Sequence, residues 1–425
     1  MKFLSFVRLV FLISLFPIAS QAANGQSSEA EVIFERFAGA AVKIRVVDVA
    51  SGAKSVIGTG FFVSSDGYLL TNYHVISNWI HDPDKYRVEY LDEDKNPHDI
   101  QVLNIDVVND LAVARAAHPA NRYLFFSEGE LSQGARIFSF GFPHDYGITI
   151  VEGTYNGLLE HAFYKKIHFT GSLNPGMSGG PAVNAQGEVI GINVATSGNQ
   201  VSFLVPVDYA RRLYSATVEE VFKPPASFVA LVEQQLKTHQ QAYVAESLFV
   251  EPQQVELGGY QAPTAPADFF NCWGGSSDDE DAPSTHTTHQ CSTDDYLYIS
   301  NRHVAGSAYM RHRLIESKSL NDYQFANLFT QNFSLNTGRL WEDAEQVTPY
   351  RCQSDALSHN ELKYKTAFCV RRYRKMDGLY DAVFKLATLG DTQRGVISEL
   401  ILFGVTFETA VDVSKRYLES FAWSR

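Results

Sequence analysis

The sequence has no excess of positive charge and, after its first 18 residues, no long apolar run. Its 425 residues carry 35 Lys and Arg against 48 Asp and Glu, a formal net charge of −13 at neutral pH. An acidic surface repels the phosphates of nucleic acids and anionic lipids, so we expect neither as a partner. A chain without a further run of about 20 apolar residues also lacks a candidate transmembrane helix. We therefore expect no stable membrane insertion of the mature protein.

Cysteines are few, and all four lie in the C-terminal half: Cys272, Cys291, Cys352 and Cys369. They contain no CxxC spacing, which makes a zinc site a poor alternative. In an exported chain an even set of cysteines is typical of two disulfides. We favour the local pairing of Cys272 with Cys291 and of Cys352 with Cys369, although the sequence alone leaves the other pairings open. We expect no bound metal and no cofactor.

The first 22 residues have the pattern of a secretory signal peptide. A basic start with Arg8 precedes an apolar run, and Ser20-Gln21-Ala22 supplies small residues before a cleavage point. We place cleavage after Ala22, with an uncleaved signal anchor as the alternative. The mature protein is then exported, to a periplasm or out of the cell.

The pattern of the chain divides it into two parts. Residues 31–223 consist of short β segments separated by glycine turns, which is typical of an all-β barrel or sandwich. A helical pattern follows over 208–222, and Lys223-Pro224-Pro225 interrupts it. We predict a helical connector over 224–250 and a separate, disulfide-containing, mixed α/β domain over 251–425.

Within that second domain the strand predictions rest on aromatic-rich segments: 295–300, 307–315 and 364–376. Residues 258–270 and 274–290 are rich in turn formers and predict loops, and 390–423 predicts mainly helix. The acidic stretch 276–289 favours a solvated loop closed by Cys272 and Cys291, although calcium through its carboxylates or a transition metal through its histidines is an alternative. The basic run 371–376 favours a solvated strand edge.

Three short motifs carry the chemistry. "TNYHV" places His74 after a strand, "NDLAV" places Asp110 before one, and "NPGMSGGP" holds Ser178 among glycines. A serine hydroxyl becomes a good nucleophile when an imidazole accepts its proton, and a carboxylate holds that imidazole in the right tautomer. The N–H groups of Gly176 and Ser178 fit the oxyanion hole that acyl transfer requires. Asp106 is a rival for the carboxylate.

The order His74, Asp110, Ser178, with these motifs, resembles the trypsin-like serine proteases, most closely their bacterial HtrA/Deg-type branch. The resemblance covers about residues 32–213 and implies two six-stranded β-barrels with the active site between them. It implies His74 as general base, Asp110 as its orienting residue and Ser178 as nucleophile. Thr71 and Asn72 match motif positions that support the backbone around His74.

The sequence departs from that branch in two ways. Met177 stands where asparagine is usual, and its side chain is a candidate for substrate contact. No stretch typical of a PDZ domain follows the protease region, so behaviour that depends on one is not carried over.

The resemblance also places Ser172 at the floor of the primary specificity pocket. Ile192, Val194, Ala195 and Thr196 would line its wall and pair with the substrate backbone. A buried cation needs an acidic partner, and residues 171–181 contain none, so we expect a preference for uncharged apolar residues at P1.

We therefore predict an exported serine endopeptidase that acts on polypeptides. The alternatives are a secreted binding protein that uses a protease-fold groove, and a latent protease gated by its C-terminal domain. A protein partner for that domain remains open.

Overall fold

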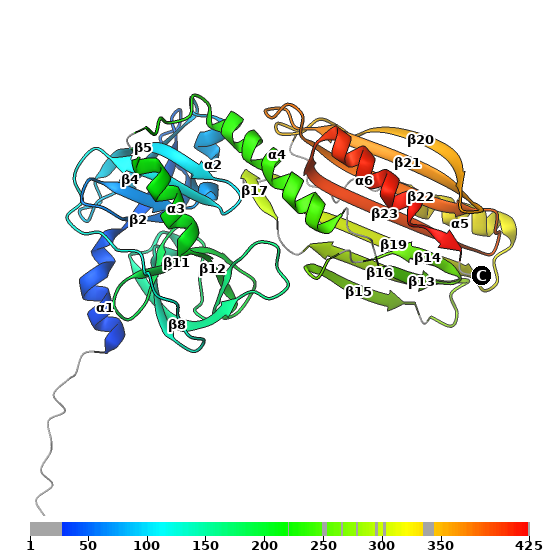
Figure 1. The fold of residues 1–425 in the computed structure, drawn as a ribbon, viewed down its shortest axis with the longest axis horizontal. Helices are drawn as coiled ribbons and strands as arrows, with labels where there is room; N and C mark the ends of the chain where they lie inside the picture. The colour runs from blue at the N-terminus through cyan, green and yellow to red at the C-terminus, as the bar shows by residue number, and fades with distance from the viewer. Residues whose placement is uncertain are drawn as a thin grey trace, which may run out of the picture.

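The structure, a computed structural model, describes residues 28–219, 221–248, 253–264, 267–277, 279–293, 296–300, 303–334 and 344–423. The predicted signal peptide and Asp278 of the acidic stretch lie outside the described residues. No helix among the described residues is long and apolar enough to cross a membrane. Two barrels lie at one end of the molecule and a large sheet at the other, with a long helix, α4, running between them (Figure 1).

The first barrel closes from six strands in the order β1-β2-β3-β6-β5-β4. Half of the residues of β1 are β-branched Val or Ile, and such side chains suit a pleated surface. Gly67 has φ +82° in the turn between β2 and β3, a conformation that favours glycine. The elements of this part are α1 (Glu29–Phe37), η1 (Ala38–Ala40), β1 (Ala41–Asp48), β2 (Lys54–Phe62), β3 (Tyr68–Thr71), α2 (Tyr73–His81), β4 (Tyr86–Leu91), β5 (Pro97–Asp106) and β6 (Leu111–Ala116).

The second barrel closes in the order β10-β11-β12-β9-β8-β7, and α3 follows it at the predicted place. The elements are β7 (Arg136–Gly141), η2 (Pro143–Asp145), β8 (Thr149–Leu158), β9 (Ile167–Phe169), β10 (Pro181–Val183), β11 (Val189–Thr196), β12 (Ser202–Pro206) and α3 (Val207–Val218). Two closed six-stranded barrels confirm the fold that the resemblance implies.

The C-terminal part is built on a seven-stranded antiparallel sheet in the order β15-β16-β19-β23-β22-β21-β20, beside two small sheets, β13-β14-β24 and β17-β18 (Figure 1). Its strands are β13 (Gln254–Leu257), β14 (Tyr260–Pro263), β15 (Phe270–Ser276), β16 (Ser284–Thr293), β17 (Leu297–Ser300), β18 (His303–Ala305), β19 (Ala308–Ser317), β20 (Arg351–His359), β21 (Leu362–Arg372), β22 (Tyr380–Leu389), β23 (Arg394–Val405) and β24 (Ala422–Trp423). Its helices are α4 (Phe228–Ser247), α5 (Asp322–Phe333) and α6 (Phe407–Glu419).

Helices cover both faces of this sheet because successive side chains of a strand point to opposite faces. On β23, Leu400 and Leu402 join a core with Val413 and Tyr417 of α6. Ile397, of the opposite parity, packs with α5 instead. This arrangement of an antiparallel sheet with covering helices agrees with the mixed α/β prediction.

Several local predictions for the C-terminal part are wrong. Residues 258–270 and 274–290 contain β14, β15 and β16 rather than only loops, because their polar residues lie on strands that pair along their whole length. The first half of 390–423 is strand β23, whose apolar residues are buried on both faces of the sheet. The run 371–376 is not a solvated edge, because β21 lies between β20 and β22, and Arg371 is buried against Asp381 at 2.8 Å.

The four cysteines come together in the local pairing. Cys272 lies directly opposite Cys291 with Cα atoms 4.1 Å apart, and Cys352 opposite Cys369 with Cα atoms 4.0 Å apart. Both pairs of sulfur atoms lie at disulfide distance. β15 and β20 are the two edge strands of the large sheet, so each pair would fasten an edge strand to its neighbour.

The first barrel and the C-terminal part share one hydrophobic core. Buried residues of α2 and the first barrel belong to the same cluster as residues of α4, β17, β18 and the stretch 347–379. Polar contacts reinforce this interface, since Lys375 Nζ donates to the carbonyl of His81, at the end of α2, and to Asp82, at 2.9 and 2.6 Å. The sequence gives no sign of this joint core.

The buried His81 and His312 and the partly buried His239 each have a ring nitrogen at hydrogen-bond distance from another segment. His81 Nε2 lies 2.7 Å from the carbonyl of Ile299, His239 Nε2 lies 2.8 Å from the hydroxyl of Tyr164, and His312 Nε2 lies 2.6 Å from the carbonyl of Pro263. Burial lowers the pKa of each ring to about 4, because it disfavours the charged form. All three are therefore neutral at pH 7.

This burial predicts acid sensitivity. Between pH 6.5 and pH 4 the unfolded chain binds protons at these histidines and the folded chain does not, so stability falls as the pH falls. Each histidine contributes a slope of about 1.4 kcal/mol per pH unit in that window. Guanidinium unfolding at pH 7.5, 6 and 5 measures the free energy of unfolding at each pH. Replacing His239 by glutamine should reduce its dependence on pH by the contribution of one histidine, about 1.4 kcal/mol per pH unit. Exposed His118 is the control, and equal stability at pH 7.5 and pH 5 would contradict the prediction.

Candidate active site

His74 and Asp110 form a close pair on the first barrel. His74 lies in the first turn of α2, directly after β3, and Asp110 lies in the turn that leads into β6. His74 Nδ1 lies 2.6 Å from Asp110 Oδ2, and the backbone N–H of His74 donates to Oδ1 at 2.8 Å. The carboxylate therefore fixes both the ring and the backbone of the histidine, and it leaves Nε2 for another partner.

The neighbours of this pair explain its local geometry. Asp110 has φ +54°, a left-handed conformation that aspartate tolerates better than most residues. Buried Asn72 donates from Nδ2 to the carbonyl of Asp110 at 2.8 Å, and Thr71 donates from Oγ1 to the carbonyl of Thr59 at 2.7 Å. The rival Asp106 instead accepts hydrogen bonds from Asn109 and so closes the turn.

Ser178 sits in a tight loop of the second barrel, against the first. The backbone N–H of Thr59, on β2, donates to the carbonyl of Ser178 at 2.8 Å. Gly179 has φ +84°, and a Cβ there would lie 2.3 Å from Thr71 Oγ1 and 2.8 Å from the Asn72 nitrogen. Only glycine allows this approach. The loop therefore brings Ser178 beside the segment that carries His74, although Ser178 Oγ makes no hydrogen bond to His74 in the described chain.

Two backbone N–H groups of this loop differ from the others in their hydrogen bonding. Those of Met177, Gly179 and Gly180 donate to backbone carbonyls at 2.9–3.0 Å. Those of Gly176 and Ser178 have no acceptor among the described residues. Gly176 has φ +98°, and a Cβ there would lie 2.4 Å from the carbonyl oxygen of Phe142. The two unpaired donors are the two that the sequence predicts for an oxyanion hole.

Two further residues hold this loop, and the sequence analysis missed both. Thr59 donates from Oγ1 to the carbonyl of Gly176 at 2.7 Å. Asn193 is fully buried on β11, and its Nδ2 donates to the carbonyls of Phe140 and Met177 at 3.0 and 3.1 Å. A lone asparagine within the apolar strand "VIGINVAT" is a signal that was available, since a buried amide needs partners.

The side chain of Met177 is fully buried with Ile137 and Leu173 in the core of the second barrel. It is therefore not available to substrate, contrary to the option left open from the sequence.

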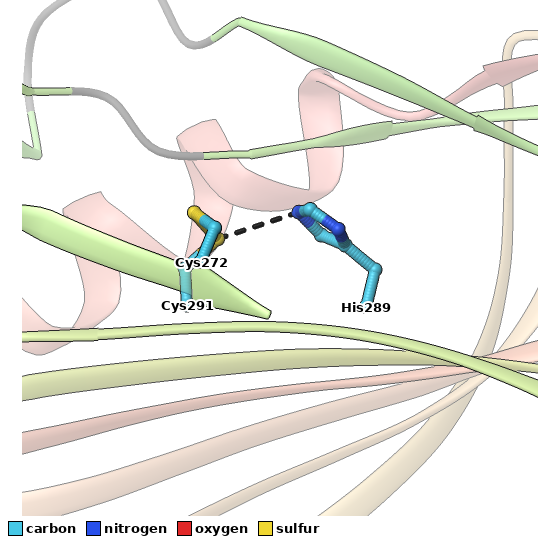
Figure 2. A group of neighbouring side chains, drawn as sticks. All are labelled: Cys272, His289 and Cys291. Carbon is cyan, nitrogen blue, oxygen red and sulfur yellow. Dashed lines mark hydrogen bonds between the residues drawn. A yellow bond between two sulfur atoms is a disulfide. The ribbon is translucent and has the colours of Figure 1, made fainter. Parts of the chain in front are cut away.

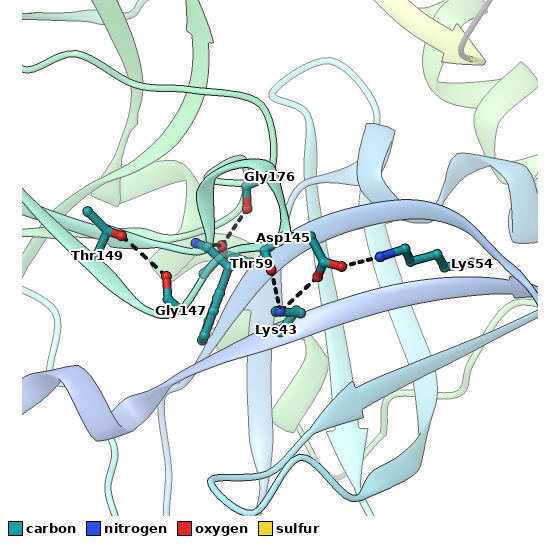
Figure 3. A network of polar contacts seen from close by, with 8 residues as sticks. Lys43, Lys54, Thr59, Asp145, Gly147, Thr149 and Gly176 are labelled. Carbon is teal, nitrogen blue, oxygen red and sulfur yellow. Dashed lines mark hydrogen bonds and ion pairs between the residues drawn. The ribbon is translucent and has the colours of Figure 1, made fainter.

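An ion-pair network joins the two barrels close to Gly176 (Figure 3). Asp145, in η2, binds Lys43 of β1 at 2.8 Å and also binds Lys54 of β2. The hydrogen bond and charge of Lys43, with those of Lys54, lower the pKa of the Asp145 carboxyl. The adjacent His144 donates its backbone N–H to the carbonyl of Pro175 at 2.8 Å, so the network also positions the loop before Gly176.

A cavity of about 240 Å³ opens beside Asp110. Val194, Ala195 and Thr196, three of the predicted specificity residues, form part of its wall. β10 pairs with β11 only as far as Ile192, so beyond Asn193 that side of β11 is open to an added strand. Ile192 is fully buried in the core, and Ser172 is exposed and outside this cavity.

The remaining walls come from loops, from strand β12 and from the C-terminal part. The other lining residues are Val107, Val108, Asn109, Tyr164, Lys165, Lys166, Ser197, Phe203, Val205, Tyr296, Leu297 and Tyr298. The last three belong to the segment that includes β17, which sequence analysis did not connect with the site. No local pattern marks them, because only the folded arrangement brings them here.

A cluster of Cys272, Cys291 and His289 has the spacing of metal ligands (Figure 2). His289 Nε2 lies 3.4 Å from Cys291 Sγ and 2.6 Å from Thr264 Oγ1. The two sulfurs lie at disulfide distance from one another, and a disulfide sulfur is not the thiolate that binds a metal. We assign no metal site here.

Two closed barrels, with a His–Asp pair on one and a glycine-framed serine loop on the other, define the class of trypsin-like peptidases. Residues 58–192 match the family model described as the trypsin-like peptidase domain. The resemblance to trypsin-like peptidases noted from the sequence is therefore confirmed over residues 58–192.

Its relatives include HtrA- and DegP-type proteases. The chain is 29% identical over 194 residues to "Serine protease HTRA1" of Xenopus laevis, covering 42% of this chain and 41% of the relative. It is 33% identical over 178 residues to the "Probable periplasmic serine endoprotease DegP-like" of Chlamydia pneumoniae, covering 39% and 35%. The similarity thus spans about two fifths of the length of these curated relatives.

Solved structures also match this half. The crystal structure of Deg5 is 26% identical and covers 43% of this chain and 91% of its own, with a TM-score of 0.38. The serine endoprotease from Yersinia pestis is 22% identical and covers 46% and 69%, with a TM-score of 0.40.

Proposed function

We propose that this protein is a serine endopeptidase that hydrolyses peptide bonds in polypeptides. The observation that carries the proposal is the pairing of His74 with Asp110, together with two unpaired N–H groups that flank Ser178. A nucleophile, an oriented base and free oxyanion donors are the parts that acyl transfer needs. The match of residues 58–192 to the trypsin-like peptidase domain model supports the same reaction.

In this mechanism Ser178 Oγ attacks the carbonyl carbon of the scissile peptide while its proton passes to His74 Nε2. Asp110 Oδ2 accepts the Nδ1–H of His74, which keeps Nε2 free to take that proton and stabilises the imidazolium. The N–H groups of Gly176 and Ser178 donate to the oxyanion. His74 then protonates the leaving amine, and a water molecule hydrolyses the acyl-enzyme by the same route.

Substrate preference is part of the proposal. Val194, Ala195 and Thr196 pair with the substrate backbone as an added strand, and the exposed Ser172 contributes to the P1 site, whereas Ile192 is buried in the core and only supports that strand. We propose an uncharged apolar P1 residue, because a buried Lys or Arg would need an acidic partner.

The organisation and location of the chain are also proposed. Residues 1–22 direct export, 31–223 form the protease domain, 224–250 connect, and 251–425 form a C-terminal domain held by two disulfides. A periplasmic or extracellular location agrees with those disulfides and with the name of the periplasmic relative.

Digestion of casein tests the proposal. Wild-type protein produces peptides with apolar residues at the new C-termini, whereas Ser178→Ala and His74→Ala proteins produce none above background and retain the wild-type circular dichroism. Ser64→Ala, on the first barrel away from these motifs, is the matched control and cleaves like wild type. Equal cleavage by Ser178→Ala contradicts the assignment, and cleavage mainly after Lys or Arg contradicts the P1 preference. Binding of casein without any cleavage by wild type would favour a groove that only binds.

A further inference from the structure

A segment of the C-terminal part reaches the histidine of the proposed active site. β17 (Leu297–Ser300) packs against α2, the helix that begins beside His74. Leu297 and Ile299 are 3% and 0% exposed in the shared core. Because alternate side chains of a strand point to opposite sides, Tyr298 faces the other way. Its ring centroid lies 5.1 Å from that of His74, with the rings inclined by 34°.

The position of Tyr298 is fixed by its neighbour in the strand. The carbonyl of Ile299 accepts a hydrogen bond from the hydroxyl of Tyr73 at 2.8 Å and lies 2.7 Å from His81 Nε2. Tyr73 and His81 are the first and last residues of α2. The helix that carries His74 therefore also anchors β17, which places the Tyr298 ring beside His74.

Tyr298 also forms a wall of the cavity beside Asp110. Tyr296 and Leu297 line the same wall, and the rings of Tyr296 and Tyr298 meet edge to face with centroids 5.3 Å apart. Burial raises the pKa of Tyr298, so its hydroxyl stays neutral. Val194 to Ser197, the strand end that is open to a substrate backbone, line the same cavity.

The size and lining of the cavity indicate which kind of substrate group it can bind. At about 240 Å³ it is several times the ~30 Å³ that one water occupies in the liquid. Val108, Phe203 and Val205 are among its apolar lining residues. A peptide added along Val194 to Thr196 would direct one side chain into it, between that strand and the ring of Tyr298.

We propose that Tyr298 is a substrate-specificity residue, supplied by the C-terminal part, that packs against an apolar substrate side chain next to the scissile peptide. This rests on the proposed function in that it assumes a peptide in the same groove. The C-terminal part thus completes the substrate site, and the cavity of about 240 Å³ beside the Tyr298 ring has the size to hold a side chain.

Peptide binding to the Ser178→Ala protein tests this without requiring catalysis. Fluorescence anisotropy compares extended peptides that carry Leu or Gly at each position around one potential scissile bond. We expect one position where Leu binds about tenfold more tightly than Gly, as an aromatic contact with a buried apolar side chain allows. Adding Tyr298→Ala removes that preference, Tyr298→Phe retains it, and Tyr323→Ala, which alters an exposed tyrosine of α5, leaves it unchanged.

Hydrolysis by the protein with Ser178 intact gives a second readout. Tyr298→Ala should lower kcat/KM for the preferred Leu peptide about tenfold and change the Gly peptide less than about twofold, with the loss mainly in KM. Fluorophosphonate labelling of Ser178 should proceed at the wild-type rate. The inference is overturned if no peptide shows a Tyr298-dependent preference. It is also overturned if Tyr298→Ala accelerates labelling and the hydrolysis of all peptides, because the ring would then obstruct the active site. Failure of wild type to cleave or label overturns the proposed function instead, while the binding result still decides this one.

Discussion

Asp110→Asn lowers kcat/KM for a peptide substrate by about 10⁴-fold, the loss that this change causes in a Ser-His-Asp triad. The amide has the shape of the carboxylate, so the turn before β6 and its bond to the His74 backbone should persist. The amide nitrogen, however, donates a hydrogen bond toward Nδ1 where the carboxylate accepts one. The imidazole then carries its proton on Nε2, which can no longer accept the proton of Ser178, and the imidazolium loses its counter-charge.

Steady-state kinetics with a fluorogenic peptide measures the effect, and the pH profile separates its cause. Activity of the variant should recover partly at high pH, where hydroxide in solution replaces the base, while KM stays close to wild type. Asp106→Asn is the matched control, since Asp106 only closes the turn with Asn109 and should keep most of the activity. An Asp110→Asn enzyme within tenfold of wild type would remove Asp110 from the mechanism.

A chain that ends at residue 223 does not fold to a stable protease domain. The two-domain pattern of the sequence favours an independent domain, but the shared core argues otherwise. The truncation removes Val232, Leu236, Leu297 and Ile299 from the buried cluster around α2. Each such side chain contributes about 1.5–3 kcal/mol when buried, so the four together correspond to about 6–12 kcal/mol. That is comparable with the whole stability of a typical domain, about 5–15 kcal/mol.

Guanidinium unfolding followed by near-ultraviolet circular dichroism tests this. The truncated chain should show a much lower midpoint or no cooperative transition, and a separately produced chain of residues 224–425 should restore it when added. Ile299→Ala in the full chain should cost about 2–5 kcal/mol, as large-to-small core substitutions do, whereas Leu389→Ala at an exposed position should cost little. A truncated chain that unfolds at the full-length midpoint would show that the protease part is independent.

The barrels and the candidate site were predictable because their signals are local. Glycine turns between β-branched segments indicate strands whatever the rest of the fold. The motifs around His74, Asp110 and Ser178 are each only a few residues long, so each can be recognised from the sequence alone. The structure brings the three motifs together in the predicted order of elements. The contact with His74 favours Asp110 over Asp106 as the orienting carboxylate, as the sequence motif also does.

The rest was not predictable because its causes lie far apart in the chain. Residues 274–290 look like a polar loop, yet pairing of β15 with β16 and of β16 with β19 makes most of them strand. The apolar stretch of β23 has no alternation, because helices bury both of its faces, and a run of that kind does not distinguish strand from helix. Tyr298 reaches His74 across more than half the chain, and only the shared core determines that contact.

The measurement that decides whether Ser178 is an activated nucleophile is covalent labelling with a fluorophosphonate, followed by mapping of the adduct by peptide mass spectrometry. Full-length protein should carry one adduct, on Ser178, and His74→Ala protein should carry none, because the hydroxyl reacts only when Nε2 accepts its proton and the N–H groups of Gly176 and Ser178 hold the phosphonyl oxygen. A folded full-length protein without an adduct, or one whose adduct forms equally without His74, would contradict the proposed enzyme.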